Sequence, residues 1–342
     1  MVYPLKRTKI GIDNLPLFST IVPMNKKITM ALVALLLATP ITANASVKRN
    51  LSNTSVPAPT IAILDSAIDM SQQKFKNSVI HEVCLIEVLF DSKPRCPNGL
   101  TTMEGPGAAT LPLEKLALSG FDHGTLMADQ AIQTNPNVKI VFIRIVGQRE
   151  NGTRELTNEA TVFNALQWVY DNQSKFNIQS VAMAQGSHSL GAAGTDYCPK
   201  TPTTVSKIQS LNNLGVGVFF PAGNNSDQRR VNWPGCIAES ITMGATLPSG
   251  NIAFYSNYDP LRVDFYARGT IALYGLNAKK TDFAGTSASV LVGATSWATI
   301  KSVKPNLNYS DLYNLILKTS TVTKSSKITN GRFINLGAAL NG

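Results

Sequence analysis

The stretch Thr60-Ile-Ala-Ile-Leu-Asp65 decides the fold that we predict for this chain of 342 residues. Its apolar side chains fall on both of the alternating faces of an extended segment. A strand that is apolar on both faces is typical of a parallel sheet covered by helices on each side. Asp65 follows the apolar run directly, at the edge of the sheet where open α/β domains form their sites. The stretch therefore predicts a buried parallel strand that delivers a carboxylate to a site.

Four further apolar runs follow along the chain, and segments with helical periodicity separate them. We expect strands at 60–64, 138–146, 180–184, 215–220 and 240–244, and helices at 125–133, 158–172, 203–213, 286–303 and 310–318. Strands that alternate with helices in this way predict an α/β fold, a doubly wound, mostly parallel β-sheet flanked by helices. The predicted domain is single and covers residues 60–342. Within it, segment 84–120 is rich in Gly, Pro and Cys and is expected to be an irregular insertion.

Residues 24–45 have the three regions of a secretory signal peptide. Lys26 and Lys27 form the basic region, residues 31–38 are an apolar run, and Ala43-Asn-Ala45 is a small-x-small cleavage site. The apolar run is too short to span a bilayer comfortably, so we expect no stable membrane span after removal of the signal. The pattern predicts an exported chain, either periplasmic or secreted to the medium.

The segments on either side of this signal carry no comparable pattern. Residues 1–23 favour Met24 as the natural start, with an upstream misassignment before it. The alternative is a cytoplasmic tail ahead of a signal anchor. Residues 46–59 are rich in Ser, Asn and Pro and are expected to form a lead-in to the domain.

The formal net charge of the chain is +10, and it falls to +6 when residues 1–45 are removed with their five basic residues and one acidic residue. The remaining excess is spread along the chain, without a Lys/Arg cluster of the kind that lines a nucleic-acid groove. We therefore expect no nucleic-acid partner.

The chain contains four cysteines, and in an exported protein an even set favours two disulfides. Of the three connectivities we prefer Cys84–Cys96 and Cys198–Cys236, because each closes a loop in a non-helical stretch. A zinc site is the weaker alternative, since no Cys-x-x-Cys or histidine partner has the required spacing. The sequence therefore predicts no metal site.

An imidazole is the second candidate site group. His123 lies in Asp122-His-Gly-Thr125 at the start of a predicted helix. The chain has only two other histidines, His81 and His188. We interpret His81 as structural and His188 as a loop residue, with lining of the cleft as the alternative for His188. His123 is therefore the candidate base.

A hydroxyl is the third candidate group. Ser287 lies in Gly285-Thr-Ser-Ala-Ser289, at the start of the predicted buried helix. Its small neighbours favour a nucleophile, whereas a helix N-cap is its structural alternative. The free N–H groups of the first helical turn are suited to bind developing negative charge. With Asp65 and His123, Ser287 completes the inventory of a Ser-His-Asp nucleophilic site.

At these three motifs the chain resembles the subtilisin-like serine proteases (subtilases), whose site residues follow the order Asp, His, Ser. The resemblance covers about residues 58–338 and implies that the three residues are catalytic. The serine motif departs from the family soon after Ser287, because Ala288 and Leu291 stand where members usually have Met and Pro. This departure indicates a divergent branch.

The resemblance also implies an oxyanion donor and a substrate-binding strand. Phe219-Phe-Pro-Ala-Gly-Asn224 is similar to the family segment whose Asn amide donates to the oxyanion, although a turn is an alternative use of Asn224. The strand that ends in Ala184, Gln185 and Gly186 is similar to the one that pairs with the peptide main chain. We expect Gly186 to allow the peptide a close approach.

The resemblance thus implies an exported serine endopeptidase that hydrolyses peptide bonds of polypeptide substrates through an acyl-enzyme. A catalytically silent, subtilase-like peptide-binding protein and an esterase with the same site are the alternatives. No cofactor is expected. Structural calcium, which is common in the family, stays open because the sequence has no EF-hand-like Asp-rich loop.

Nineteen residues separate the predicted cleavage site from Asp65. Even small domains need about 40 residues, so this segment is too short for the folded prodomain that secreted subtilases usually carry. We therefore expect either unassisted folding or control by a separate inhibitor protein.

Overall fold

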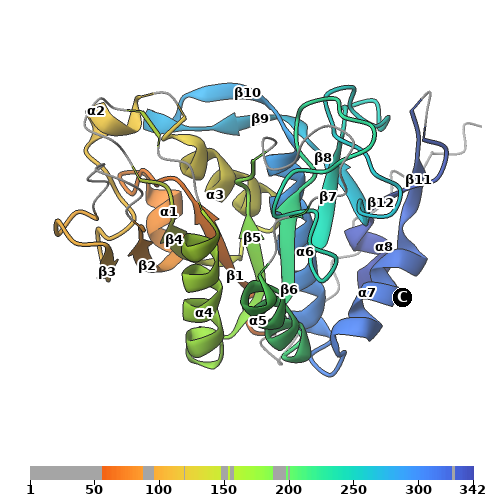
Figure 1. Cartoon of the computed structure of the whole chain (residues 1–342), viewed down its shortest axis with the longest axis horizontal. Coiled ribbons are helices and arrows are strands. Elements are labelled where there is room, and N and C mark those ends of the chain that lie inside the picture. The colour runs from red at the N-terminus through yellow and green to blue at the C-terminus, as the bar shows by residue number, and fades with distance from the viewer. Residues whose placement is uncertain are drawn as a thin grey trace, which may run out of the picture. The chain divides into compact units, whose positions relative to one another are not determined.

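A ten-stranded sheet organises the described part of the chain (Figure 1). The computed structural model describes residues 56–87, 96–118, 120–147, 153–154, 158–187, 198, 201–325 and 328–342. The predicted signal peptide, residues 1–23, most of the lead-in and His188 lie outside these residues.

The strand order of this sheet is β11-β12-β8-β7-β6-β5-β1-β4-β2-β3. Neighbouring strands run parallel except at the two edges, where β3 pairs antiparallel with β2 and β11 with β12. The strands are β1 (Thr60–Asp65), β2 (Val79–Leu85), β3 (Thr102–Glu104), β4 (Lys139–Arg144), β5 (Ile178–Met183), β6 (Gly217–Pro221), β7 (Ile241–Thr246), β8 (Phe265–Arg268), β11 (Thr321–Thr323) and β12 (Gly331–Phe333). This is the mostly parallel sheet expected from the sequence.

The strand order reverses at β1. From β1 the chain builds the β4–β2 side first and then continues with β5 on the other side of β1. In open α/β sheets such a reversal leaves a crevice beyond the carboxyl ends of the two diverging strands. Asp65 is the last residue of β1, so the topology places it at this crevice.

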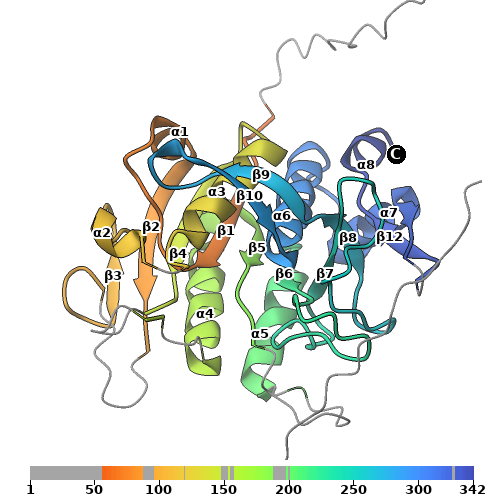
Figure 2. The same cartoon turned by 90° about the horizontal axis from the view of Figure 1, so that it is seen from above.

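Helices cover both faces of the sheet, as Figure 2 shows. One layer contains α3 and α6 and the other contains α4 and α5, since their buried residues belong to two different core clusters. In the described residues, no helix is both long and apolar enough to cross a membrane. The helices are α1 (Gln73–Ser78), α2 (Leu113–Leu116), α3 (His123–Thr134), α4 (Glu159–Phe176), α5 (Pro202–Asn213), α6 (Thr286–Val303), α7 (Tyr309–Thr319) and α8 (Leu336–Asn341).

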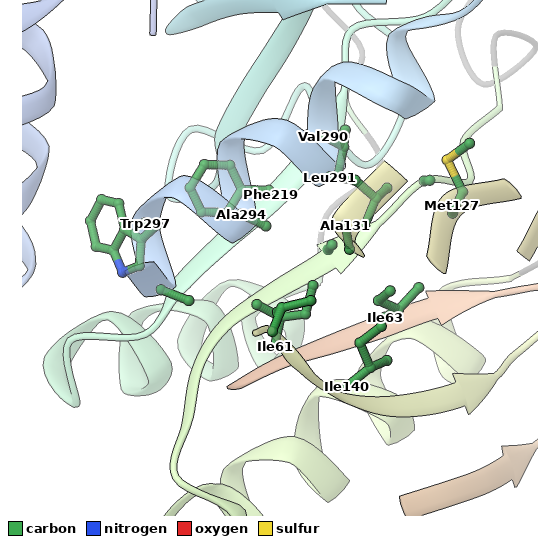
Figure 3. Packing of buried hydrophobic residues seen from close by; sticks show 14 of the residues in the cluster. Ile61, Ile63, Met127, Ala131, Ile140, Phe219, Val290, Leu291, Ala294 and Trp297 are labelled. Atoms are coloured by element: carbon green, nitrogen blue, oxygen red, sulfur yellow. The ribbon is translucent and has the colours of Figure 1, made fainter. Parts of the chain in front are cut away.

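β1 is buried on both faces, which confirms the interpretation of its sequence. Ile61 and Ile63 pack into the α3–α6 layer (Figure 3). Ala62 and Leu64 pack into the α4–α5 layer. All four side chains are fully inaccessible to solvent, and burial of large aliphatic side chains contributes roughly 1.5–3 kcal/mol each.

Helix α6 has the bounds predicted from the sequence, residues 286–303. It crosses the centre of its layer and contacts five strands of the sheet, β1, β5, β6, β7 and β8. Trp297 near its C-terminus packs edge-to-face on Phe219 of β6, with ring centroids 5.8 Å apart. Because α6 is apolar nearly all round, it is stable only in this buried position.

The segment predicted as an irregular insertion contains regular elements. Residues 84–85 finish β2, and β3 and α2 follow. The sequence of β2 does not look like a buried strand because it includes His81 and Glu82. The Glu82 carboxylate is buried but accepts hydrogen bonds from the N–H groups of Gly107 and Ala109 at 3.1 and 3.2 Å. Because β2 contains polar residues whose partners lie elsewhere in the fold, its sequence is not an apolar run and does not indicate a strand.

Two disulfides tie loops to this fold. Cys84 is bonded to Cys96, and Cys198 is bonded to Cys236. These are the pairings preferred from the sequence. The first links β2 to the segment that precedes β3, and the second links two stretches 38 residues apart.

A carboxylate at the junction of β7, β8 and α7 makes folding sensitive to pH. Asp264 accepts hydrogen bonds from the N–H of Thr242 at 2.7 Å and the hydroxyl of Tyr313 at 2.8 Å. Burial raises its pKa from 3.8 to about 6 in spite of these bonds. The folded state therefore binds the proton more tightly than the unfolded state, so this contribution to stability is full below pH 3.8 and is lost as the pH rises through about 6.

We expect Asp264→Asn to abolish this loss of folding stability at higher pH. Asparagine keeps the shape of the side chain, can bond both partners and does not titrate. The side chain is still partly accessible to water, so the pH-dependent difference should be about 1–2 kcal/mol between pH 4 and 7. Urea unfolding followed by tryptophan fluorescence at several pH values measures it. Parallel stability curves for the two proteins would contradict the assignment.

Candidate active site

Asp65 and His123 form a hydrogen-bonded pair at the end of β1. The Asp65 side chain is fully buried, and its Oδ1 atom lies 2.8 Å from Nδ1 of His123. The N–H of Ser66 donates to the same oxygen at 2.7 Å. Burial acts to raise the pKa of Asp65, but the charge and hydrogen bond of His123, with the Ser66 N–H, outweigh it and lower the pKa below 3.8. The group is therefore a carboxylate at neutral pH.

An ionised carboxylate accepts hydrogen bonds only. Nδ1 of His123 must therefore carry the proton that is shared with Asp65. In the neutral ring this leaves the lone pair on Nε2, which is the atom that can act as a base. Asp65 orients the imidazole from its buried side. The ring is 16% exposed and therefore remains open to solvent.

His123 is the first residue of α3, and its neighbours fix where that helix begins. The Ser66 hydroxyl donates to the carbonyl of Phe121 and accepts from the N–H of Gly124, both at 3.0 Å. The ring of Phe283, from β10 (Lys280–Ala284), packs edge-on against the imidazole with centroids 5.8 Å apart. Sequence analysis missed Phe283, although it lies only two residues before the Gly285 motif.

Ser287 lies in the first turn of α6 and is 7% exposed. Its hydroxyl donates to the carbonyl of Ala184 at 3.0 Å. The side chain of the next residue, Gln185, contacts both Asp65 and His123. The structure therefore brings all three predicted catalytic residues to one sheet edge. Among the described residues, His123 Nδ1 donates to Asp65 and lies 3.1 Å from Gln185 Nε2, and no hydrogen bond joins the imidazole to Ser287.

Asn224 presents an amide donor beside Ser287. Its Oδ1 accepts from the N–H and the hydroxyl of Thr286 at 2.8 and 2.9 Å. Because a backbone N–H can only donate, the amide oxygen must face Thr286, and Nδ2 points away as a donor. A Cβ at Gly285 would lie 3.2 Å from Nδ2 and would crowd it. Nδ2 and the N–H of Ser287 have no hydrogen-bond partner within the described segments.

The segment predicted to bind substrate has two buried residues, Ala184 and Gln185, and one exposed residue, Gly186. Ala184 and Gln185 are 4% and 8% exposed, and the side chain of Gln185 faces the Asp65–His123 pair instead of solvent. Gly186 is exposed, and the neighbour that requires a glycine there is the Trp233 carbonyl. A Cβ on Gly186 would lie 2.8 Å from that oxygen, which is too close for any other residue.

Across the described ranges, no group of three or more His, Cys, Asp or Glu side chains could hold a metal ion. The site as it stands consists of a buried carboxylate, an oriented imidazole, a hydroxyl and two unpaired N–H donors. Such a set can activate a hydroxyl nucleophile and bind an oxyanion.

Comparison with known proteins agrees with this chemistry. The chain is 24% identical over 252 residues to an alkaline protease of Alkalihalobacillus alcalophilus, covering 68% of this chain and 58% of that protein. It is 25% identical over 197 residues to a cuticle-degrading serine protease of Arthrobotrys oligospora, covering 54% and 44%. The chain thus spans about half the length of these relatives.

Solved structures support the fold. Proteases from Pseudoalteromonas arctica superpose with a TM-score of 0.66 at 16% identity, covering 84% of this chain and 90% of that chain. A cold-adapted subtilisin-like serine proteinase gives 0.58 at 18% identity, covering 82% and 89%. The sequence profile of the Subtilase family matches residues 57–333, and the chain therefore belongs to this family.

A glycine directly after His123 is required by packing. A Cβ on Gly124 would lie 2.4 Å from the carbonyl oxygen of Ala67 and 2.7 Å from the ring of Phe142. We expect Gly124→Ala to destabilise the protein by about 2–4 kcal/mol, because backbone must move to admit the methyl group. Urea denaturation measures the change.

Gly337→Ala is the matched control. Gly337 lies in α8, and the nearest atom to its Cβ position is Asn335 Oδ1 at an ordinary 3.7 Å. Alanine favours helix, so this variant should be neutral or more stable by up to about 1 kcal/mol. Equal losses in the two variants would refute the packing argument.

Proposed function

We propose that this subtilase is an exported serine endopeptidase that cleaves peptide bonds through an acyl-enzyme on Ser287. The observation that carries the proposal is the buried Asp65 carboxylate bonded to Nδ1 of His123 at 2.8 Å. This bond leaves Nε2 as the base, at the sheet edge that also carries Ser287 at the start of α6. The proposed substrates are polypeptides.

In the proposed mechanism, His123 Nε2 removes the proton of Ser287 as Oγ attacks the scissile carbonyl carbon. The hydroxyl must first turn from the carbonyl of Ala184, its present acceptor. The carbonyl oxygen becomes an oxyanion, for which Nδ2 of Asn224 and the N–H of Ser287 supply two donors.

His123 then returns its proton to the leaving amine, and the C–N bond breaks to give the Ser287 ester. Water attacks this ester with His123 again as base, which releases the acid and regenerates the hydroxyl. Asp65 keeps the ring in its working tautomer and stabilises the imidazolium formed in each half-reaction.

We assign recognition of the peptide main chain to residues 184–186, which follow β5 at the crevice. Main-chain hydrogen bonds give affinity for an extended peptide, while pockets for side chains give specificity. Export is proposed from the pattern of residues 24–45, and one relative, from Dichelobacter nodosus, is an extracellular basic protease. Control by a separate inhibitor protein also remains a proposal.

Replacement of the nucleophile tests the reaction class. Ser287→Ala should abolish both hydrolysis of casein and labelling by a fluorophosphonate probe, because no other group would attack the probe. The variant should keep the circular dichroism of the wild type. Equal labelling of the two proteins would refute the role of Ser287, and a folded wild type that never reacts would favour the silent peptide-binding alternative.

Replacement of the amide donor tests the oxyanion site. Asn224→Ala should lower kcat by roughly 10²–10³ with little change in KM, because the donor acts mainly on the charge of the transition state. Asn225→Ala is the control, since the Asn225 side chain makes no hydrogen bond in the part of the chain described. A comparable loss in both variants would contradict the assignment.

A further inference from the structure

Gln185 has a side chain that the family resemblance does not explain. It was predicted to bind substrate, yet its amide turns inward and is 8% exposed. Its Oε1 accepts from the guanidinium of Arg154. Its Nε2 lies 2.9 Å from Asp65 Oδ1 and 3.1 Å from His123 Nδ1. The amide therefore connects the Arg154 guanidinium to the buried Asp65–His123 pair.

Only one orientation of the Gln185 amide satisfies the partners at both of its ends. An arginine donates hydrogen bonds only, so the atom that faces Arg154 must be the amide oxygen. An ionised carboxylate accepts only, so the atom that faces Asp65 must be the NH₂ group. The hydrogen-bonding requirements of the two partners thus lock the amide against a flip.

We propose that Gln185, held by Arg154, is a positioning residue that fixes the Asp65 carboxylate and the tautomer of His123. The proposal rests on the proposed function, because the residue acts only through the base of that reaction.

The first step of the argument concerns the carboxylate. Oδ1 of Asp65 receives three donors, from Ser66, His123 and Gln185. Oδ2 is buried and has no partner among the described residues. With every bond on one oxygen, nothing on the other oxygen prevents rotation of the group. Gln185 supplies one of the two side-chain contacts that hold the carboxylate.

The second step concerns the imidazole. The N–H of Gln185 and the Nδ1–H of His123 converge on Asp65 Oδ1. If His123 lost the Nδ1 proton, Gln185 would have to leave Asp65 in order to donate to Nδ1, so the arrangement favours the tautomer with Nε2 free. The N–H dipole also directs its positive end toward the ring and opposes a second positive charge there.

The third step concerns Arg154. Its guanidinium lies over Gly120, where a Cβ would be 2.9 Å from Nη1. Gly120 also has a φ of +78°, a backbone conformation that favours glycine, so a side chain there would be strained. The charge of Arg154 is one of the influences that lower the pKa of Asp65. On the imidazole side of the pair, Asp122 is the charged residue that directly precedes His123 in the chain.

Gln185→Met tests the proposal, because methionine has a similar length and cannot form these hydrogen bonds. We expect kcat per titrated active site to fall about tenfold, the effect of one ordinary hydrogen bond, with KM changed less than twofold. The acidic limb of the pH profile of kcat/KM should move to higher pH, since a carboxylate with fewer donors stabilises the imidazolium better.

Arg154→Met should change kcat and the pH profile in the same directions, and Arg154→Lys should restore part of each because it keeps the charge. A higher KM with unchanged kcat and pH profile would instead give Gln185 the substrate-binding role and overturn the proposal. A lower thermal stability with unchanged kcat per titrated site would overturn it as well.

A readout without turnover separates this proposal from the proposed function. In the Ser287→Ala background, proton NMR should show the low-field resonance of the Nδ1–H bonded to Asp65, which His123→Ala removes. Gln185→Met should shift or broaden it. If the wild type proves inactive but the resonance responds to Gln185, only the function fails. If the resonance is unaffected, the positioning role fails.

Discussion

A carboxylate buried at the end of the central strand is the constraint on which the rest of the site depends. An unpaired charge inside a protein costs several kcal/mol, so Asp65 is stable there as an anion only if donors surround it. The donors come from three places: the N–H after β1, the first residue of α3, and the segment after β5. The reversal of strand order at β1 is what allows these elements to meet.

The α3–α6 layer supplies the other two candidate catalytic residues of the site. His123 and Ser287 both lie in the first turns of helices of the α3–α6 layer, where unpaired N–H groups are available. Glycines are placed where those turns approach other atoms most closely: Gly124 against Ala67 and Gly285 beside Asn224. Backbone contact thus determines the sequence of the motifs as much as the reaction does.

The sequence predicts the parts of this molecule whose residues must be apolar or chemically specific. The strand 60–64 and the helix 286–303 carry such local signals and form where they are expected, and the three motif residues come to one sheet edge. Edge strands such as β2 carry polar residues that tertiary contacts satisfy, so local patterns do not reveal them. The direction of the Gln185 side chain depends on Arg154, which is 31 residues away along the chain.

The direction of the strands also separates the two rims of the sheet. Helix α4 ends at Phe176, and β5 begins at Ile178, so the last turn of α4 lies at the amino ends of the strands, opposite the crevice. Ser174 in that turn is exposed. All four cysteines are oxidised, so Ser174→Cys would add the sole free thiol. Immobilisation on a solid support through this thiol would leave the cleft facing the liquid.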